Sequence, residues 1–187
     1  MARSPKLNRE MVVREAIALL DEGGLEAVSL RKLADRLGVS APSLARHVGD
    51  KSQLIALLSA AIFNDALDTI PQGLAGDLWL EAFGHALRNK QAETRDIAGL
   101  LLTVPPDPAV HDSVNQRLRS LMREAGLDGP RAQVEQAAIQ ALVTGWMMFE
   151  KSPRAREFAA RLPHDRGFED SLRALIGGFA AERRPAD

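Results

Sequence analysis

The sequence contains no cysteine and no tyrosine, and aromatic residues make up 4% of its 187 residues. The lack of cysteine excludes disulfide bonds, thiolate metal sites and cysteine nucleophiles, and it fits a reducing compartment. No apolar run approaches the roughly 20 residues that span a bilayer, and residues 1–10 lack the apolar core of a signal peptide. We therefore expect a cytoplasmic protein without a membrane partner.

An excess of charge of either sign is also missing, since 24 Lys and Arg residues stand against 25 Asp and Glu residues. The 45% of hydrophobic and 26% of charged residues are typical of a globular protein and exclude a disordered chain. Residues 1–52 carry nine basic and seven acidic side chains, whereas residues 53–187 carry 15 and 18. Within residues 29–51, five basic side chains stand against two acidic ones. So short a basic stretch is by itself more often a solvated surface than a nucleic-acid site.

Strand signals are nearly absent, whereas apolar residues recur at helical spacing throughout the chain. Glycine and proline breaks divide it into about nine or ten helical segments. We expect an all-α fold with an N-terminal domain over residues 1–52 and a C-terminal domain over residues 53–187. The first helix is predicted over residues 8–22, with Val13, Ile17 and Leu20, together with Ala16, on its apolar face.

Two short helices joined by a tight turn follow the first helix. Ser29 and Ser40 are suitable N-caps for them, and Gly38 can adopt the left-handed backbone that the turn requires. Apolar residues that would hold the two helices at a fixed angle are Leu30, Leu33, Leu37, Leu44 and Val48. This pattern predicts a helix-turn-helix, whose second helix enters the DNA major groove. Asp50, with Gln53 three residues later, then forms a capping box that opens a long helix.

The second helix of this motif exposes a ridge of small residues followed by basic ones. Small side chains at its start let the helix sink into a groove that is about 12 Å wide. Arg31 and Lys51 begin the flanking helices, where they can hold phosphates on either side. The predicted DNA-binding residues are Arg31, Ser40, Ala41, Pro42, Ser43, Arg46, His47 and Lys51. His47 can alternatively stack at the helix end, and we interpret Lys32 and Arg36 as solvated.

The stretch from Leu7 to Leu57 resembles the DNA-binding headpiece of the TetR family of transcriptional regulators. The similarity is carried by Ser29-Leu30-Arg31, Leu33-Ala34, Leu37-Gly38-Val39, Leu44, His47-Val48 and Lys51. The resemblance implies that Pro42 and Ser43 touch the groove, including a thymine methyl group, and that Lys51 binds phosphate. It also implies that Arg31, Arg46 and His47 reach base edges or phosphates.

The family commonly has a tyrosine that contacts the phosphate backbone where this chain has Ala45. We hypothesise that Arg46 replaces this contact. The resemblance implies a ligand-responsive regulator, with repression the commoner behaviour, that binds a palindromic DNA operator as a homodimer and is released by a small-molecule effector. The alternative is an all-helical dimeric interaction or ligand-binding module with weak or lost operator binding.

The C-terminal domain contains apolar helices that need cover on more than one side. Residues 137–149 have Gln140 and Thr144 as their polar side chains, so one face can meet the core and another a partner. We expect this segment and the last helix, over about residues 168–183, to pair with their symmetry mates as a four-helix bundle, as the resemblance also implies. The predicted interface residues are Ile139, Val143, Met147, Phe168, Leu172, Leu175, Ile176 and Phe179. A single monomeric core is the alternative.

In this family, the helices between the headpiece and the dimer helices enclose a cavity for a small effector. The candidate residues here are Phe63, Leu67, Trp79, Phe83, His85, Leu102, His111, Asn115, Leu118, Gln140, Thr144 and Trp146. The alternative for each of them is a place in the core. Tetracycline is not expected as the effector, because Leu67 and Ala86 fall where the drug would need polar ligands.

Sequence signals for catalysis are missing. The chain has no glycine-rich phosphate loop, no His-Glu-x-x-His motif and no Gly-x-Ser-x-Gly motif. Its four histidines are scattered, and no two are spaced four residues apart, as a helical metal site requires. We therefore expect a protein that is not an enzyme and has no cofactor or metal.

Overall fold

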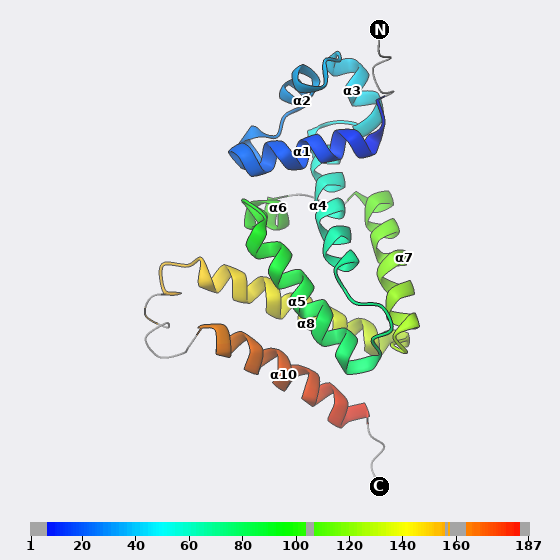
Figure 1. Cartoon of the computed structure of the whole chain (residues 1–187), viewed down its shortest axis with the longest axis vertical. Coiled ribbons are helices and arrows are strands. Elements are labelled where there is room, and N and C mark those ends of the chain that lie inside the picture. Colours follow the sequence, from blue (N-terminus) through cyan, green and yellow to red (C-terminus); the bar gives the residue numbers. More distant parts are fainter. Residues whose placement is uncertain (1–6, 104–106, 156, 158–163, 184–187) are drawn as a thin grey trace. The chain divides into compact units, whose positions relative to one another are not determined.

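The computed structural model describes residues 7–103, 107–155, 157 and 164–183. Over these residues the chain folds into helices and turns, and no strand occurs among them (Figure 1). The elements are α1 (Arg9–Gly23), the short 3-10 helix η1 (Leu25–Ala27), α2 (Leu30–Leu37), α3 (Ala41–Val48), α4 (Lys51–Asp68), α5 (Gly76–Glu93), α6 (Ile97–Thr103), α7 (Pro108–Glu124), α8 (Gly129–Glu150) and α10 (His164–Arg183). The predicted all-α fold is confirmed.

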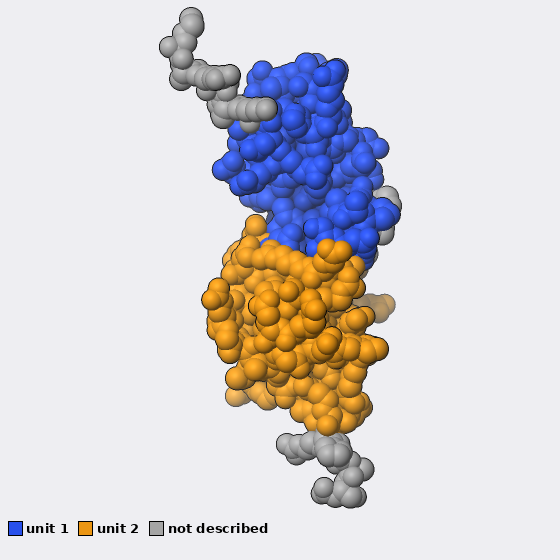
Figure 2. Space-filling model, turned by 90° about the vertical axis from the view of Figure 1, so that its right-hand side faces the viewer, with its two compact units in different colours: residues 1–64, 94–114 blue, residues 65–93, 115–187 orange. Residues whose placement is uncertain are grey.

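The chain forms two compact units (Figure 2). Unit 1 contains residues 1–64 and 94–114, and unit 2 contains residues 65–93 and 115–187. Helix α4 runs without a break from unit 1 into unit 2, since its last four residues belong to the second unit. The functional division between residues 52 and 53 stays a prediction.

Helices α1, α2 and α3 pack against one another within unit 1. Helix α1 begins where the Asn8 side chain accepts a hydrogen bond from the backbone N–H of Met11 at 2.8 Å. Its buried residues are Val12, Ala16, Leu19 and Leu20. Of the four residues predicted on this face, Ala16 and Leu20 are buried, whereas Val13 and Ile17 are half-buried.

The corner between α5 and α6 is fixed to the end of α1 within unit 1. Arg95 donates to the carbonyl oxygen of Glu22 at 2.9 Å, and the Asp96 carboxylate accepts from the backbone N–H of Leu25 at 3.0 Å. Asp96 has a φ of 51°, a backbone conformation that non-glycine residues adopt at an energetic cost. Gly24 has a φ of 73°, and a Cβ there would lie 2.1 Å from Asp96 Oδ2. The corner therefore depends on the small residue at position 24.

Unit 2 is built around the mutual packing of α5, α8 and α10. Its largest fully buried side chains include Phe83 of α5, Ile139 of α8, and Phe168 and Leu172 of α10. Gly84 lets α5 approach closely, because a Cβ at that position would lie 2.9 Å from Leu172 Cδ2. The three helices thus bury their large apolar side chains against one another.

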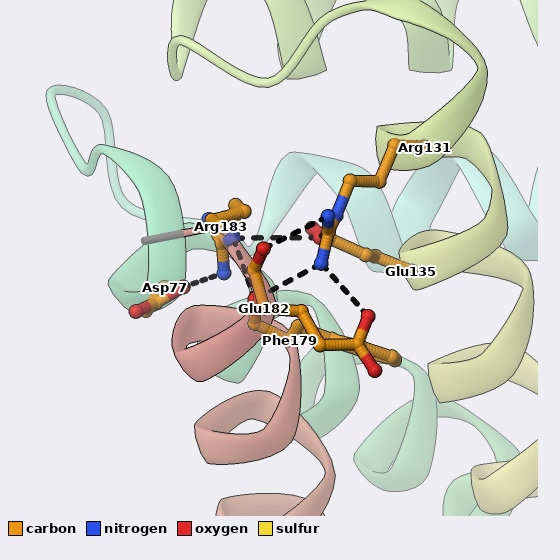
Figure 3. Close-up of polar contacts among 6 residues, drawn as sticks. All are labelled: Asp77, Arg131, Glu135, Phe179, Glu182 and Arg183. Carbon is orange, nitrogen blue, oxygen red and sulfur yellow. Dashed lines mark hydrogen bonds and ion pairs between the residues drawn. The ribbon is translucent and has the colours of Figure 1, made fainter. Parts of the chain in front are cut away.

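A network of charged side chains ties the end of α10 to α5 and α8 (Figure 3). Glu135 of α8 is buried, with 2% of its side chain exposed, and its Oε1 lies 3.3 Å from Arg131 Nε and 3.4 Å from Arg183 Nε. Arg183 also pairs with Asp77 of α5, and Arg131 pairs with Glu182 at 2.9 Å. Both arginines therefore compensate the buried charge of Glu135 while they fix the C-terminal end of α10.

In the part of the chain that the structure describes, no helix has the length and apolar character needed to cross a membrane.

Candidate nucleic-acid interface and ligand pocket

The turn between α2 and α3 is closed by backbone geometry that the sequence predicted. Gly38 adopts the left-handed conformation, with a φ of 65° and a ψ of 33°. The next residue, Val39, donates from its backbone N–H to the carbonyl oxygen of Ala34 at 3.0 Å, which closes the end of α2. Leu33 and Leu44 are both fully buried, so they fix the two helices against the core of unit 1.

Each helix of the motif is capped as predicted. Ser29 accepts from the backbone N–H of Lys32 at 3.2 Å, and Ser40 accepts from the backbone N–H of Ser43 at 3.3 Å. The capping box at the start of α4 is reciprocal: Gln53 N–H donates to Asp50 Oδ1 at 2.9 Å, and Asp50 N–H donates to Gln53 Oε1 at 3.1 Å. The helix starts are therefore held in place by side chains.

All eight predicted DNA-binding residues lie in unit 1 on α2, α3, the cap of α3 or the first residue of α4. The exposed ones are Arg31, Ser40, Pro42, Arg46 and Lys51. Ala41, Ser43 and His47 are half-buried. The first turn of α3 thus presents small residues to the outside, and the basic residues Arg46 and His47 follow in its last turn.

The charges of the headpiece fall into two groups. Arg36 pairs with Glu15 at 2.9 Å and with Glu22 at 2.8 Å, so this guanidinium joins α2 to α1. The hydrogen bond from Arg36 lowers the pKa of Glu22 below its ordinary value of 4.5, and the hydrogen bond to Glu22 raises the pKa of Arg36. Among the described residues no carboxylate forms an ion pair with Arg31, Arg46 or Lys51.

The helix starts add to this positive charge. The first turns of α2, α3 and α4 contain no acidic residue. A helix N-terminus carries roughly half a positive charge, which Arg31 reinforces at the start of α2. At the start of α4 the Asp50 carboxylate caps the helix beside Lys51. The charge at the start of α2 costs a little helix stability and attracts phosphate.

The sequence analysis missed Arg9 as a neighbour of the recognition motif. Arg9 is the exposed first residue of α1, and its Nε donates to the carbonyl oxygen of His47, at the end of α3, at 3.3 Å. No local pattern could have linked them, because 38 residues separate the two in the chain. Arg9 thus places a further exposed cation beside α3, in addition to Arg31, Arg46 and Lys51.

The predicted effector-binding residues are divided between the two units, so whether they form one site stays a prediction. Phe63, Leu102 and His111 belong to unit 1, where His111 is exposed and the side chain of Leu102 lies outside the described structure. The residues in unit 2 are Leu67, Trp79, Phe83, His85, Asn115, Leu118, Gln140, Thr144 and Trp146. The prediction of one continuous set therefore gains no support from these positions.

Several of the polar candidates have partners within unit 2. His85 Nε2 lies 3.4 Å from a carboxylate oxygen of Glu169, and Thr144 accepts from the Gln91 side chain at 3.3 Å. Gln140 accepts from Gln136 at 2.8 Å, and Trp146 donates to Glu150 at 2.9 Å. The first two contacts connect α5 to α10 and to α8, and the other two lie within α8. They agree with the alternative that such residues belong to the packed helices of unit 2.

Unit 2 contains a hollow of about 460 Å³ where α4 ends. Leu67 and Trp79, two of the predicted effector-binding residues, line it, and Trp79 stacks on Phe83 with ring centroids 5.3 Å apart. A second hollow, of about 520 Å³, lies between α7 and the start of α8 and is lined by none of the predicted residues. The first hollow is therefore the candidate ligand pocket.

The predicted dimer residues are mostly buried within the protomer, and the dimer interface itself stays a prediction. Six of them are already buried within the protomer: Ile139, Val143, Met147, Phe168, Leu172 and Ile176. Leu175 and Phe179 are half-buried. Helix α8 is apolar nearly all round, so the sequence did not show which face α5 and α10 cover, and the large side chains turn out to fill the protomer core.

The outer face of α8 carries smaller side chains. Val134 is 64% and Met148 41% exposed, and the exposed Ala137, Ala141 and Gly145 lie between them at helical spacing. Exposed Ala174, Gly177 and Gly178 occupy α10. Among the described residues no group of three His, Asp or Glu side chains is placed to hold a metal ion.

Residues 12–58 match the family model described as bacterial regulatory proteins, tetR family. The tetracycline repressor protein class D of Escherichia coli is 35% identical over 125 residues, which cover 65% of this chain and 56% of the repressor. The class A repressor from transposon 1721 of Escherichia coli is 31% identical over 151 residues, which cover 79% of this chain and 68% of that protein. The match to class D thus spans little more than half the length of that relative.

A TetR variant from Acinetobacter baumannii AYE, solved in complex with minocycline, has a similar structure. The TM-score is 0.73 at 25% sequence identity, and the match covers 96% of this chain and 100% of the other. The similarity therefore extends beyond the helix-turn-helix to the helices of unit 2.

Proposed function

Because the chain belongs to the TetR family of bacterial regulatory proteins, we propose that it is a DNA-binding transcriptional regulator, acting as a repressor. It holds a palindromic operator as a homodimer and leaves it when a small effector binds. The proposal assigns no chemical reaction and no cofactor to the chain.

The observation that carries the proposal is that α3 is capped and anchored by buried side chains, while its outward residues and the nearby Arg31 and Lys51 are exposed. The helix is capped, its inward side chains Leu44 and Val48 are buried, and Pro42 and Arg46 point into solvent. A small, rigid first turn followed by a cation suits direct contact with base edges in the major groove. Arg31 and Lys51 lack carboxylate partners among the described residues and so are available to phosphates.

A homodimer would supply a second copy of α3, with its exposed ridge of Pro42 and Arg46. We place the dimer contact on the outer face of α8 and α10, defined by Val134, Ala137, Ala141, Gly145, Met148, Ala174, Gly177 and Gly178. Small residues let helix backbones approach closely. Val134 and Met148, at either end of this face on α8, are exposed apolar side chains whose burial would stabilise the dimer. A twofold dimer presents two ridges about 34 Å apart, or a near multiple, and so reads a palindrome.

We place the effector in the hollow at the end of α4, since this helix runs from the recognition motif to that hollow. An effector that favours one position of α4 would shift the population of DNA-binding dimers. Coupling free energies between two sites are typically about 1–3 kcal/mol, and a ligand that binds both states equally shifts nothing. The named relatives are tetracycline repressors, whereas Leu67 and Ala86 are buried apolar residues here, so we propose a different effector.

Fluorescence anisotropy with the DNA that lies upstream of the gene for this protein tests DNA binding. Three cations per half-site give about six phosphate or base contacts per dimer, so log K should fall with log salt at a slope of roughly −4 to −5. Lys51→Ala should make this slope less steep by roughly one or two units, because each dimer loses two phosphate contacts.

The matched control is Arg123→Ala, which removes an exposed arginine of unit 2 and should leave both affinity and slope unchanged. Folded dimer that binds its upstream DNA no better than unrelated DNA would contradict the proposal.

One observation favours a second function, an all-helical dimeric interaction or ligand-binding module with weak or lost operator binding. Ala45 is half-buried on α3 and offers no side-chain donor to a phosphate, where the family commonly has tyrosine. Ligand binding without any operator binding would support this second function.

A further inference from the structure

Arg9 joins the start of α1 to the end of α3 within unit 1, where these two helices pack against each other. Its Nε–H donates to the carbonyl oxygen of His47 at 3.3 Å. The last carbonyl groups of a helix lack partners within that helix, and an arginine side chain can satisfy one of them. The contact therefore holds the last turn of α3, which contains Arg46 and His47, against α1.

The guanidinium of Arg9 has donors left after this bond. The group is planar and carries five N–H groups, and its two terminal nitrogens form an edge that does not include Nε. Arg9 is exposed, and among the described residues no carboxylate pairs with it and no acceptor takes a hydrogen bond from its terminal nitrogens. Two parallel N–H groups on one edge match two oxygens of a phosphate. One side chain can therefore hold the His47 carbonyl and a phosphate at the same time.

The charge at the end of α3 also depends on Arg9. The carbonyl of Ala45 accepts from the backbone N–H of Gly49 at 2.8 Å, and the carbonyl of His47 accepts from Arg9. Carbonyl oxygens at a helix end carry negative partial charge, which repels phosphate. The guanidinium places a full positive charge there and so reverses the local sign. Glu10 adds an exposed carboxylate to α1, but successive helical residues point about 100° apart.

We propose that Arg9 is a further DNA-binding residue of the headpiece. In each half-site its terminal N–H groups hold one phosphate while its Nε–H holds the end of α3, so the phosphate contact and the position of α3 are coupled through one side chain. This inference rests on the proposed function, since it adds a residue to the same DNA-binding site. The slope of log K against log salt becomes steeper by roughly two units than Arg31, Arg46 and Lys51 alone would give.

The salt dependence of operator binding by the full-length protein tests the phosphate contact. Fluorescence anisotropy with the upstream DNA, repeated at several salt concentrations, should show that Arg9→Ala binds about tenfold more weakly near physiological salt. The slope should become less steep by roughly two units, because each dimer loses two phosphate contacts. Loss of a purely structural contact would lower the affinity and leave the slope unchanged.

Two further variants separate charge from geometry and position. Arg9→Lys keeps the positive charge but replaces the planar fork with a single ammonium group, so it should keep the wild-type slope and lose about threefold in affinity. Arg14→Ala is the matched control, since it removes another exposed arginine of α1 that lies about 140° around the helix axis from Arg9. It should leave both affinity and slope unchanged.

A wild-type slope in Arg9→Ala, with or without a loss of affinity, would overturn the inference, and so would an equal change of slope in Arg14→Ala. If the wild type prefers its upstream DNA to unrelated DNA and Lys51→Ala reduces the slope, such a result removes only the role of Arg9. A wild-type protein without this preference would overturn the proposed function and the role of Arg9 together.

Discussion

At the scale of single residues, Arg36 and Arg46 differ in whether a carboxylate pairs with them. Arg36 is neutralised by Glu15 and Glu22, whereas Arg46 extends from α3 with no ion pair to a described residue. Each lies in the last turn of an eight-residue helix, so the local sequence does not show which of them forms ion pairs. The interpretation of Arg36 as merely solvated was incomplete, because glutamates from a different helix complete its environment.

The Arg36 contacts predict a stability difference that depends on pH. Arg36→Ala removes the partner that lowers the pKa of Glu22. A lowered folded-state pKa contributes stability above the unfolded value, and this contribution is lost as the pH falls through the folded value. The variant should therefore melt below the wild type at pH 7, and the difference should shrink once the pH falls below 4.5.

Circular-dichroism melts across this pH range measure the effect. Lys32→Ala, which removes an exposed cation from the same helix, serves as the control and should show no such pH-dependent difference. A constant gap between Arg36→Ala and wild type down to full protonation of Glu22 would refute the link between the two residues.

A double-mutant cycle tests whether Arg46 replaces the missing tyrosine. If it does, Ala45→Tyr alone should leave operator affinity nearly unchanged, whereas the same substitution in an Arg46→Ala background should raise operator affinity about a hundredfold. This factor corresponds to two charged hydrogen bonds per dimer, each of about 1.5 kcal/mol. Operator titrations of the four proteins measure it, and equal gains in both backgrounds would show that the two positions act independently.

At the scale of helices, local chemistry was predictable and the choice of buried face was not. The caps at Ser29 and Ser40 and the box formed by Asp50 and Gln53 depend on residues three apart, so the sequence contains all the information. The inward face of α8 depends on α5 and α10, which meet it only in the folded chain.

The charged network at the end of α10 gives a prediction at this scale. Arg183→Met removes one of two cations that compensate the buried Glu135 and also breaks the contact with Asp77. Because a buried carboxylate with less compensation is costly, the free energy of unfolding should fall by about 1–3 kcal/mol. Urea denaturation measures this loss.

The matched substitution Arg173→Met lies on the same helix and affects an exposed pair with Asp170, so it should cost less than about 0.5 kcal/mol. Equal losses for the two variants would mean that burial of Glu135 does not decide the effect.

At the scale of the whole molecule, the proposed function requires two copies of α3, one from each protomer of a homodimer. Most of the side chains predicted to join the protomers are buried within the protomer. Small residues are exposed on α8 and α10 instead. A contact of small residues brings the helices close and is sensitive to any added bulk or charge.

Ala141→Glu should therefore separate the protomers without unfolding them, because this position is exposed in the single chain. Sedimentation velocity should show a monomer, and operator affinity should fall by at least about a hundredfold as the second ridge is lost. Ala92→Glu changes an exposed alanine of α5 away from this face and should remain dimeric. A dimeric, fully active Ala141→Glu protein would place the contact elsewhere.

Methylation interference on the chain's own upstream DNA tests most directly that α3 enters the major groove in duplicate. Methyl groups on guanine N7 obstruct that groove, so the account predicts two clusters of interfering guanines, related by twofold symmetry and about 34 Å or a near multiple apart. Arg46→Ala should weaken interference at equivalent positions in both clusters. Specific binding with no interference, or with one unpaired cluster, would contradict it.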